Sequence, residues 1–79
     1  MKWFVYTVCC SDGTLYTGMT NDIASRLNKH NSGKGAKYTK GRSPVVLKLL
    51  TEYGSKSEAA SAEYAFKKLS REQKMKLIG

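Results

Sequence analysis

The sequence predicts an α+β fold in which a three-stranded antiparallel sheet is flanked by helices, in the order β-β-α-β-α-α. Two observations lead to this class. Three short runs are rich in β-branched and aromatic residues, and three further stretches begin with residues that cap helices. The 79 residues are enough for one core. We therefore treat residues 1–79 as a single small domain.

The first two strands are expected to form a hairpin. Residues 3–9 and 14–20 have strand composition and flank a Ser-Asp-Gly turn. A two-residue Asp-Gly turn would place Tyr6 and Tyr16 on opposite faces of the sheet. A three-residue Ser-Asp-Gly loop, or a bulge, would place both phenols on one face, because side chains alternate along a strand. The sequence leaves both registers open.

The first helix and the segment after it follow the hairpin. Thr20 or Asn21 is expected to cap a helix that continues to about Asn31, with Ile23 and Leu27 on its apolar side. Residues 32–44 contain three glycines and the single proline, which is typical of a loop.

The third strand and the last two helices complete the domain. Residues 45–53 form a nearly continuous apolar run, so we expect a well-buried strand. Ser55 and Glu58 have the spacing of a capping box, which predicts a helix to about Leu69. Ser70 and Gln73 repeat that spacing before a short last helix.

Charge is segregated along the chain. Fourteen Lys and Arg oppose six Asp and Glu, giving a net charge of +8. No acidic residue lies between Asp22 and Glu52. A second basic group has Glu72 as its counter-charge and comprises Lys67, Lys68, Arg71, Lys74 and Lys76. This pattern indicates a polyanionic partner. The alternatives are a basic surface without a ligand and a surface that binds an acidic protein.

Other compositional features exclude several classes. No hydrophobic run approaches the ~20 residues of a membrane helix, and the basic segments lack a strongly apolar opposite face. Cys9 and Cys10 are adjacent, so a bridge between them would be strained, and no His or Cys cluster has zinc spacing. We expect a soluble cytoplasmic protein, without a membrane partner, that is a monomer.

Glu63 lies on the inner side of the second helix. Ala59 is four positions before it and Phe66 three positions after it, and both belong to the apolar stripe. An isolated buried carboxylate costs several kcal/mol at least, so it needs a partner. The alternative is an edge position where Glu63 pairs with Lys67, four positions on.

Arg26 and His30 lie four positions apart and share one face of the first helix. His30 is the single histidine of the chain, and a lone helical histidine is usually a surface or packing residue. Beside Arg26, whose fork matches phosphate oxygens, it could instead form a phosphate-oriented pair. The loop "SGKGAKYTKGR" is not a P-loop, but its glycines and lysines suit contacts to a phosphate backbone.

Together these parts resemble a known family. The triplets Phe4-Val5-Tyr6 and Tyr16-Thr17-Gly18 are similar to the two that name the GIY-YIG nuclease superfamily, although Phe and Val replace Gly and Ile in the first. The pair Arg26 and His30 and the later Glu63 match its further motifs. The stretches "NSGKGAKYTKGRSPVVL" and "KKLSREQKMKLI" resemble its small, stand-alone bacterial branch. Some relatives carry an Asn further along the chain than the Glu. This sequence has no evident counterpart of that Asn, and Gln73 and Met75 occupy the corresponding region.

The resemblance implies a metal-dependent endonuclease that hydrolyses phosphodiesters in DNA or structured nucleic acid, with DNA repair as a setting. The implied catalytic residues are Tyr6, Tyr16, Arg26, His30 and Glu63. Glu63 would bind one Mg²⁺ or Mn²⁺, Gly18 would be structural, and nucleic acid, most often DNA, would contact Lys34, Lys37, Tyr38, Lys40 and Arg42. Tyr6 would take a proton from water, with its pKa lowered by Arg26 and the metal. The alternative is a non-catalytic nucleic-acid-binding module with a degenerate nuclease site.

Overall fold

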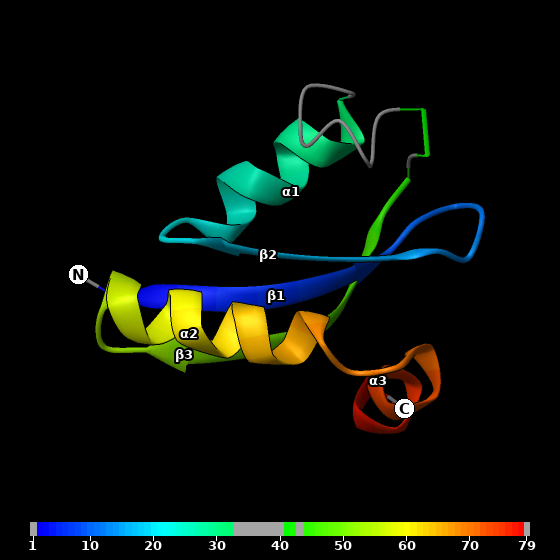
Figure 1. Cartoon of the computed structure of the whole chain (residues 1–79). Helices are drawn as coiled ribbons and strands as arrows, with labels where there is room; N and C mark the ends of the chain where they lie inside the picture. The colour runs from blue at the N-terminus through cyan, green and yellow to red at the C-terminus, as the bar shows by residue number, and fades with distance from the viewer. Residues whose placement is uncertain (1, 33–40, 43, 79) are drawn as a thin grey trace.

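A computed structural model describes residues 2–32, 41–42 and 44–78. The elements are β1 (Trp3–Cys9), β2 (Leu15–Thr20), α1 (Ile23–Asn31), β3 (Val46–Tyr53), α2 (Lys56–Lys67) and α3 (Arg71–Ile78). The sheet is three-stranded with the order β2-β1-β3, and both pairings are antiparallel (Figure 1). The predicted fold class and element order are confirmed.

The β1–β2 hairpin has the three-residue loop. The Gly13 N–H donates to the Cys10 carbonyl at 3.0 Å, and Gly13 has a φ of 86°. That left-handed conformation is one that glycine adopts without steric cost. Tyr6 consequently lies opposite Gly18, and Tyr16 lies opposite Val8. Both phenols therefore share one face of the sheet, as the second of the two registers predicts.

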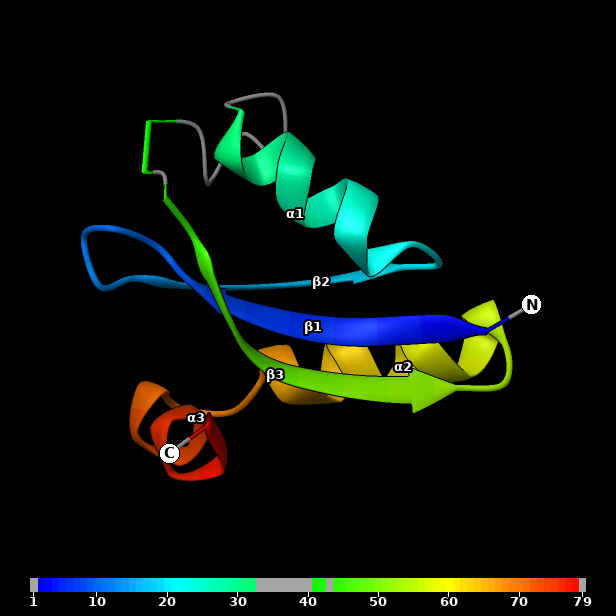
Figure 2. The same ribbon diagram turned by 180° about the vertical axis from the view of Figure 1, so that it is seen from behind.

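Both faces of β1 are covered, because four consecutive residues, Val5 to Val8, are buried. The face that carries Tyr6 packs against α1. Its core cluster contains Tyr6, Val8, Cys10 and Val45, with Tyr16, Ile23, Leu27 and Leu47 packed around them. On the other face, the Lys56 ammonium at the start of α2 lies 5.3 Å from the Trp3 ring centroid. α2 runs along this second face (Figures 1 and 2).

The helix starts are capped, with one correction. Asp22 caps α1, because its carboxylate accepts the Ser25 N–H at 3.1 Å. The prediction of Thr20 or Asn21 is wrong, since Thr20 is still the last residue of β2. The capping residues Ser55 and Ser70 are confirmed, each accepting the N–H three positions on at 3.2 Å. α2 ends at Lys67, two residues before the predicted Leu69.

The prediction that β3 is well buried is wrong. Val46 is 54% exposed and Leu50 is 42% exposed. The physical reason is position: β3 is an edge strand, and no helix lies in front of it when the molecule is seen from behind (Figure 2). The apolar run of β3 therefore reflects the preference of these residues for strands and not the burial of their side chains. No helix in the described ranges is long and apolar enough to span a bilayer.

Candidate active site

The Tyr6 hydroxyl is the meeting point of the predicted site. Tyr6 and His30 are both 0% exposed, and the Tyr6 oxygen lies 3.0 Å from His30 Nε2. The Arg26 Nε–H donates to the same oxygen at 3.3 Å. Arg26 and His30 lie one turn apart on α1, so the helix delivers both side chains to one point above β1. His30 is therefore not a surface residue, whereas Arg26 beside it is partly exposed. These contacts fit both a packing histidine and a site histidine.

Gly18 makes room for this arrangement. A Cβ atom at Gly18 would lie 2.7 Å from the Tyr6 hydroxyl and 3.2 Å from Tyr16 Cε2. The Tyr6 ring can therefore cross from β1 onto β2 only because Gly18 lacks a side chain. The Tyr16 ring lies beside it, with centroid distances of 6.4 Å to Tyr6 and 5.4 Å to His30. The predicted structural role of Gly18 has a direct steric basis.

The donors and acceptors of this network can be assigned. An arginine N–H can only donate, so the Tyr6 oxygen accepts from Arg26. Burial, and then the charge of Arg26, lower the pKa of His30 from its ordinary value. The ring is therefore neutral at pH 7 and has one acceptor nitrogen. We assign the proton between them to Tyr6, which donates it to His30 Nε2, so that the imidazole proton lies on Nδ1.

Burial dominates the electrostatics of Tyr6. It raises the pKa of the phenol above its ordinary value, while the hydrogen bond and charge of Arg26 act in the opposite direction. Tyr16 and Glu63 raise the pKa of Tyr6 further, by smaller amounts. The expected effect of Arg26 has the right sign, but desolvation outweighs it. Tyr6 is therefore a neutral phenol at pH 7.

Glu63 is partly buried and also pairs with Lys67, so it has features of both the inner and the edge position considered for it. Its carboxylate lies 2.7 Å from the Lys67 ammonium, which is the predicted pair four positions apart. The Glu63 side chain is only 19% exposed, against 50% for Lys67. The hydrogen bond to Glu63 raises the pKa of Lys67, and Tyr16 and Tyr6 add smaller contributions. Glu63 and Lys67 therefore form a partly buried ion pair at the end of α2.

Glu63 could bind a hard cation such as Mg²⁺ only if water or substrate oxygens supplied the remaining ligands. Within the described ranges, no group of three or more His, Cys, Asp or Glu residues could surround a metal. Mg²⁺ is commonly bound by one or two carboxylates, several waters and substrate phosphates. The Glu63 carboxylate, whose side chain is 19% exposed, is one such ligand. Glu63 is thus the residue that would bind the ion.

The predicted nucleic-acid contacts lie mostly beyond what the structure describes. Lys34, Lys37, Tyr38 and Lys40 lie outside the described residues. Arg42 is described, and its Nε lies 3.4 Å from the Asp12 carboxylate at the hairpin turn. Asp12 is further held by the Thr14 hydroxyl at 2.6 Å, and these hydrogen bonds lower the pKa of its carboxyl group.

The sequence analysis did not identify Lys67 and Asn31 as parts of the site. Lys67 was considered as a partner of Glu63, but not as a cation near the phenols. Its spacing from Glu63 was the available indication. The Asn31 side chain accepts the Val45 N–H at 2.6 Å and so fixes the end of α1 beside the start of β3. This contact positions the adjacent His30, and no local pattern predicts it.

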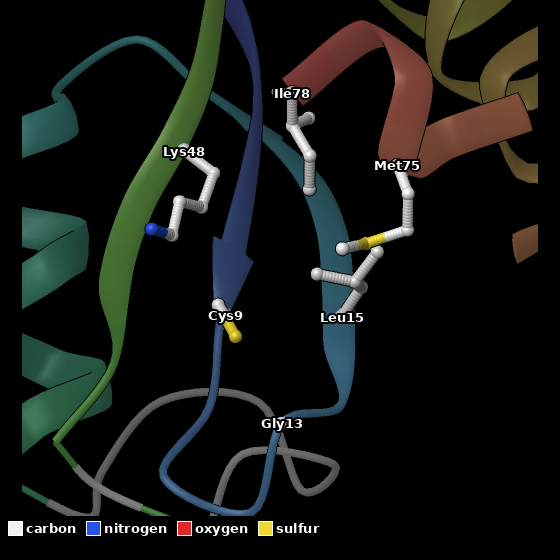
Figure 3. A pocket seen from close by; sticks show the side chains of 6 residues that line it. All are labelled: Cys9, Gly13, Leu15, Lys48, Met75 and Ile78. Atoms are coloured by element: carbon white, nitrogen blue, oxygen red, sulfur yellow. The ribbon is translucent and has the colours of Figure 1, made fainter. Parts of the chain in front are cut away.

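A hollow of about 110 Å³ lies away from the Tyr6 site, between α3 and the sheet (Figure 3). Cys9 and Leu15 line it from the sheet, and Met75 and Ile78 from α3. Cys9 is on the strand face opposite Tyr6, since the two are an odd number of residues apart. The Lys48 ammonium points away from α3 in this view (Figure 3). The hollow is a gap in apolar packing and is separate from the site.

The steric role of Gly18 is testable by Gly18→Ala. We expect a loss of about 1–3 kcal/mol in the free energy of unfolding, because the new methyl group collides with the Tyr6 ring. Denaturant unfolding measures this loss. Gly54→Ala is the matched control, since its Cβ would meet nothing closer than a Glu58 side-chain oxygen at 3.7 Å. Equal stability of the two variants would contradict the close approach of Tyr6 to β2.

The burial of His30 predicts a pH dependence of stability. Its pKa is lowered in the folded state, so the unfolded chain binds more protons as the pH falls below about 6.5. The stabilisation is complete above that pH and is lost as the pH falls towards the folded pKa. We expect the free energy of unfolding to decrease from pH 7.5 to 5.5, and to decrease less in His30→Gln. Parallel curves for both proteins would contradict a buried neutral imidazole.

Comparison with known proteins agrees with this geometry. The family profile described as the GIY-YIG catalytic domain matches residues 2–76. A UPF0213 protein of Staphylococcus epidermidis is 54% identical over 77 residues, covering 98% of this chain and 94% of that protein. A UPF0213 protein of Halobacterium salinarum is 55% identical over 74 residues, covering 94% and 96% of the two chains.

Solved structures give the same relationship. The solution NMR structure of the UPF0213 protein from Bacillus halodurans superposes with a TM-score of 0.64 at 49% identity, covering 99% of this chain and 83% of that one. A solution structure of a protein from E. faecalis has a TM-score of 0.64 at 39% identity, covering 98% and 83%. With the two triplets, Arg26, His30 and Glu63 placed as described, the chain belongs to the GIY-YIG family and to its small stand-alone UPF0213 group.

Proposed function

We propose that this protein is a metal-dependent endonuclease that hydrolyses phosphodiester bonds in DNA or structured nucleic acid. The observation that carries the proposal is the network in which Arg26 donates to Tyr6 and Tyr6 lies against a neutral His30. It combines a fixed cation with a path for a proton. These are two things that phosphodiester hydrolysis requires from a protein.

Arg26 would stabilise the charge that builds up on the scissile phosphate. Its guanidinium has five N–H donors, and the Tyr6 oxygen occupies the one at Nε. That bond fixes the plane of the fork, and the donors that are not bonded to tyrosine can face phosphate oxygens. Tyr16 is a further hydrogen-bond partner of Arg26, which adds to its fixed orientation. The group is thus preorganised, so that little reorganisation is required during the reaction.

Tyr6 and His30 would move the proton of the attacking water together. As the water oxygen forms its bond to phosphorus, the bond from phosphorus to the leaving sugar oxygen breaks, and one water proton passes to the Tyr6 oxygen. The original Tyr6 proton passes at the same time to His30 Nε2, which becomes positively charged. The leaving oxygen takes up a proton from solvent, and His30 later returns one to solvent. Tyr6 is fully buried at rest, so the water must first displace one of the side chains that cover it. This relay suits a phenol whose pKa is raised, because no phenolate has to exist before the reaction. The lowered pKa of His30 keeps the acceptor nitrogen free at pH 7.

Glu63 would bind the divalent ion, either Mg²⁺ or Mn²⁺. The ion, when bound, would neutralise charge on the phosphate. Lys67 restrains the carboxylate at 2.7 Å and reduces the cost of its partial burial. Lys67 also adds a positive charge next to the phenols. Arg26 on α1 and Lys67 on α2 would then both stabilise a bound phosphate.

A second candidate function is a non-catalytic nucleic-acid-binding module. The observation that favours it is the direct Glu63–Lys67 ion pair, which competes with a metal for the carboxylate. In that case the same basic surface would bind phosphates, and the network around Tyr6 would serve stability alone. The two candidates differ in whether a divalent ion produces cleavage.

Nicking of supercoiled plasmid, with and without Mg²⁺ or Mn²⁺, tests the proposal. We expect metal-dependent nicking by the wild type and a loss of about 100-fold or more in Glu63→Gln and in Arg26→Lys. Arg26→Lys keeps the charge but loses the planar fork. Metal-free binding of DNA should persist in Glu63→Gln. Glu52→Gln is the matched control, because Glu52 is an exposed carboxylate on β3 paired with Lys2 at 3.5 Å.

The outcomes separate the candidates. Wild-type nicking that Glu63→Gln retains would contradict the assigned metal ligand. Salt-sensitive binding without nicking in either metal would select the non-catalytic module. Purifying all variants by one procedure controls for a contaminating nuclease.

A further inference from the structure

A second basic site lies on α3, which belongs to the sheet face opposite Tyr6. An open depression of about 150 Å³ is lined by Thr14, Leu15, Arg71 and Lys74. It lies between the start of β2, just after the hairpin turn, and the first turn of α3. Two of its four lining residues are cations, and none is acidic. We name this group of four residues the α3 depression.

Contacts with the rest of the fold restrain both cations of the α3 depression. Arg71 Nη2 donates to the Gly13 carbonyl at 3.1 Å, which ties α3 to the hairpin. The Lys74 ammonium lies over the Phe66 ring of α2, 5.7 Å from its centroid, which is a cation–π contact. Restrained cations lose less conformational entropy on binding an anion than free surface lysines do.

Nearby carboxylates do not cancel this charge. Asp12 belongs to the same hairpin, but it accepts two hydrogen bonds from Thr14 and pairs with Arg42 at 3.4 Å. Its negative charge is therefore engaged inside the turn. Glu72 lies on α3 itself and is exposed, as Arg71 is, so solvent screens both charges alike. The two lining cations still outnumber this one carboxylate.

The α3 depression follows another cation along the chain, at the end of α2. Lys67 is the last residue of α2, and its ammonium pairs with Glu63 at 2.7 Å. From there the chain passes directly into α3 (Figure 1), and Arg71 follows Lys67 by four residues. A small phosphorylated metabolite would need one such cation site. Several separated sites match a ligand with phosphates at regular spacing, which is the backbone of a nucleic acid.

We propose that the α3 depression binds a backbone phosphate of the nucleic acid at a distance from the phosphate that is cleaved. This inference rests on the proposed function and names the surface along which its substrate lies. A contact of this kind positions the substrate without reading its sequence. It would also give the domain a binding surface that is independent of residues 33–40.

The test is metal-free binding of a fluorescent 20-base-pair duplex, measured by anisotropy between 50 and 200 mM salt. Arg71→Gln with Lys74→Gln should flatten the slope of log affinity against log salt by about 1–2 units. The control, Lys2→Gln with Lys56→Gln, removes the same charge beside the N-terminus and at the first residue of α2. The N-terminus and the start of α2 lie at the end of the sheet away from α3 (Figure 1). This control should leave the slope within about half a unit of wild type. Equal losses in both double variants would overturn the inference, since bulk charge would explain them.

A second variant and a second measurement guard against loss of folding. Lys74→Gln alone keeps the Arg71 bond to Gly13. It should reduce the magnitude of the slope of log affinity against log salt by about 0.9. Titrating labelled wild-type protein with a 12-base-pair duplex should shift the amide signals of Thr14, Leu15 and Arg71. Unshifted signals at these residues, an unchanged slope, or no binding of duplex by the wild type would each overturn the inference.

This test is separable from the test of catalysis. If the α3 variants lose their salt slope while no metal supports nicking, the binding surface stands and the hydrolysis fails. If nicking occurs but the slope is unchanged, the hydrolysis stands and the α3 depression is not part of the substrate surface.

Discussion

The structure depends on one buried hydroxyl group. The Tyr6 side chain is fully buried, and an unpaired hydroxyl there would cost about 1–3 kcal/mol. Arg26 and His30 satisfy it from one face of α1, which fixes where that helix lies over the sheet. Gly18 must lack a side chain for the hydroxyl to reach them. A single packing requirement thus links two strands and a helix, and it creates the site at the same time.

The same burial determines the chemistry that the site can perform. Desolvation raises the pKa of Tyr6 and lowers that of His30, so both groups are neutral at rest. A phenol in this state is a poor base alone but can pass a proton to a neutral imidazole. Charge is supplied from the edges of the site by Arg26 and Lys67. This division between a neutral centre and a cationic border would suit the proposed phosphodiester substrate.

The sequence predicts the fold class and the element order, because these depend on local patterns. Motif spacing also predicts that Tyr6, Arg26 and His30 lie together, which the structure shows. The hairpin register could not be decided, since the left-handed Gly13 becomes evident only in three dimensions. The burial of β3 was predicted wrongly because edge position depends on strand order, not on the strand itself. The direction of the Tyr6 pKa shift depends on whether burial or Arg26 has the larger effect. The sequence alone does not show which is larger.

The most direct test of this account is the tautomer of His30 in the folded protein at pH 7, measured from the nitrogen chemical shifts of its imidazole. The chain has one histidine, so the signal is unambiguous. The account predicts a neutral ring with its proton on Nδ1 and an unprotonated Nε2 that accepts from Tyr6. A proton on Nε2, or a positively charged ring, would contradict the Arg26–Tyr6–His30 network on which the proposed mechanism rests.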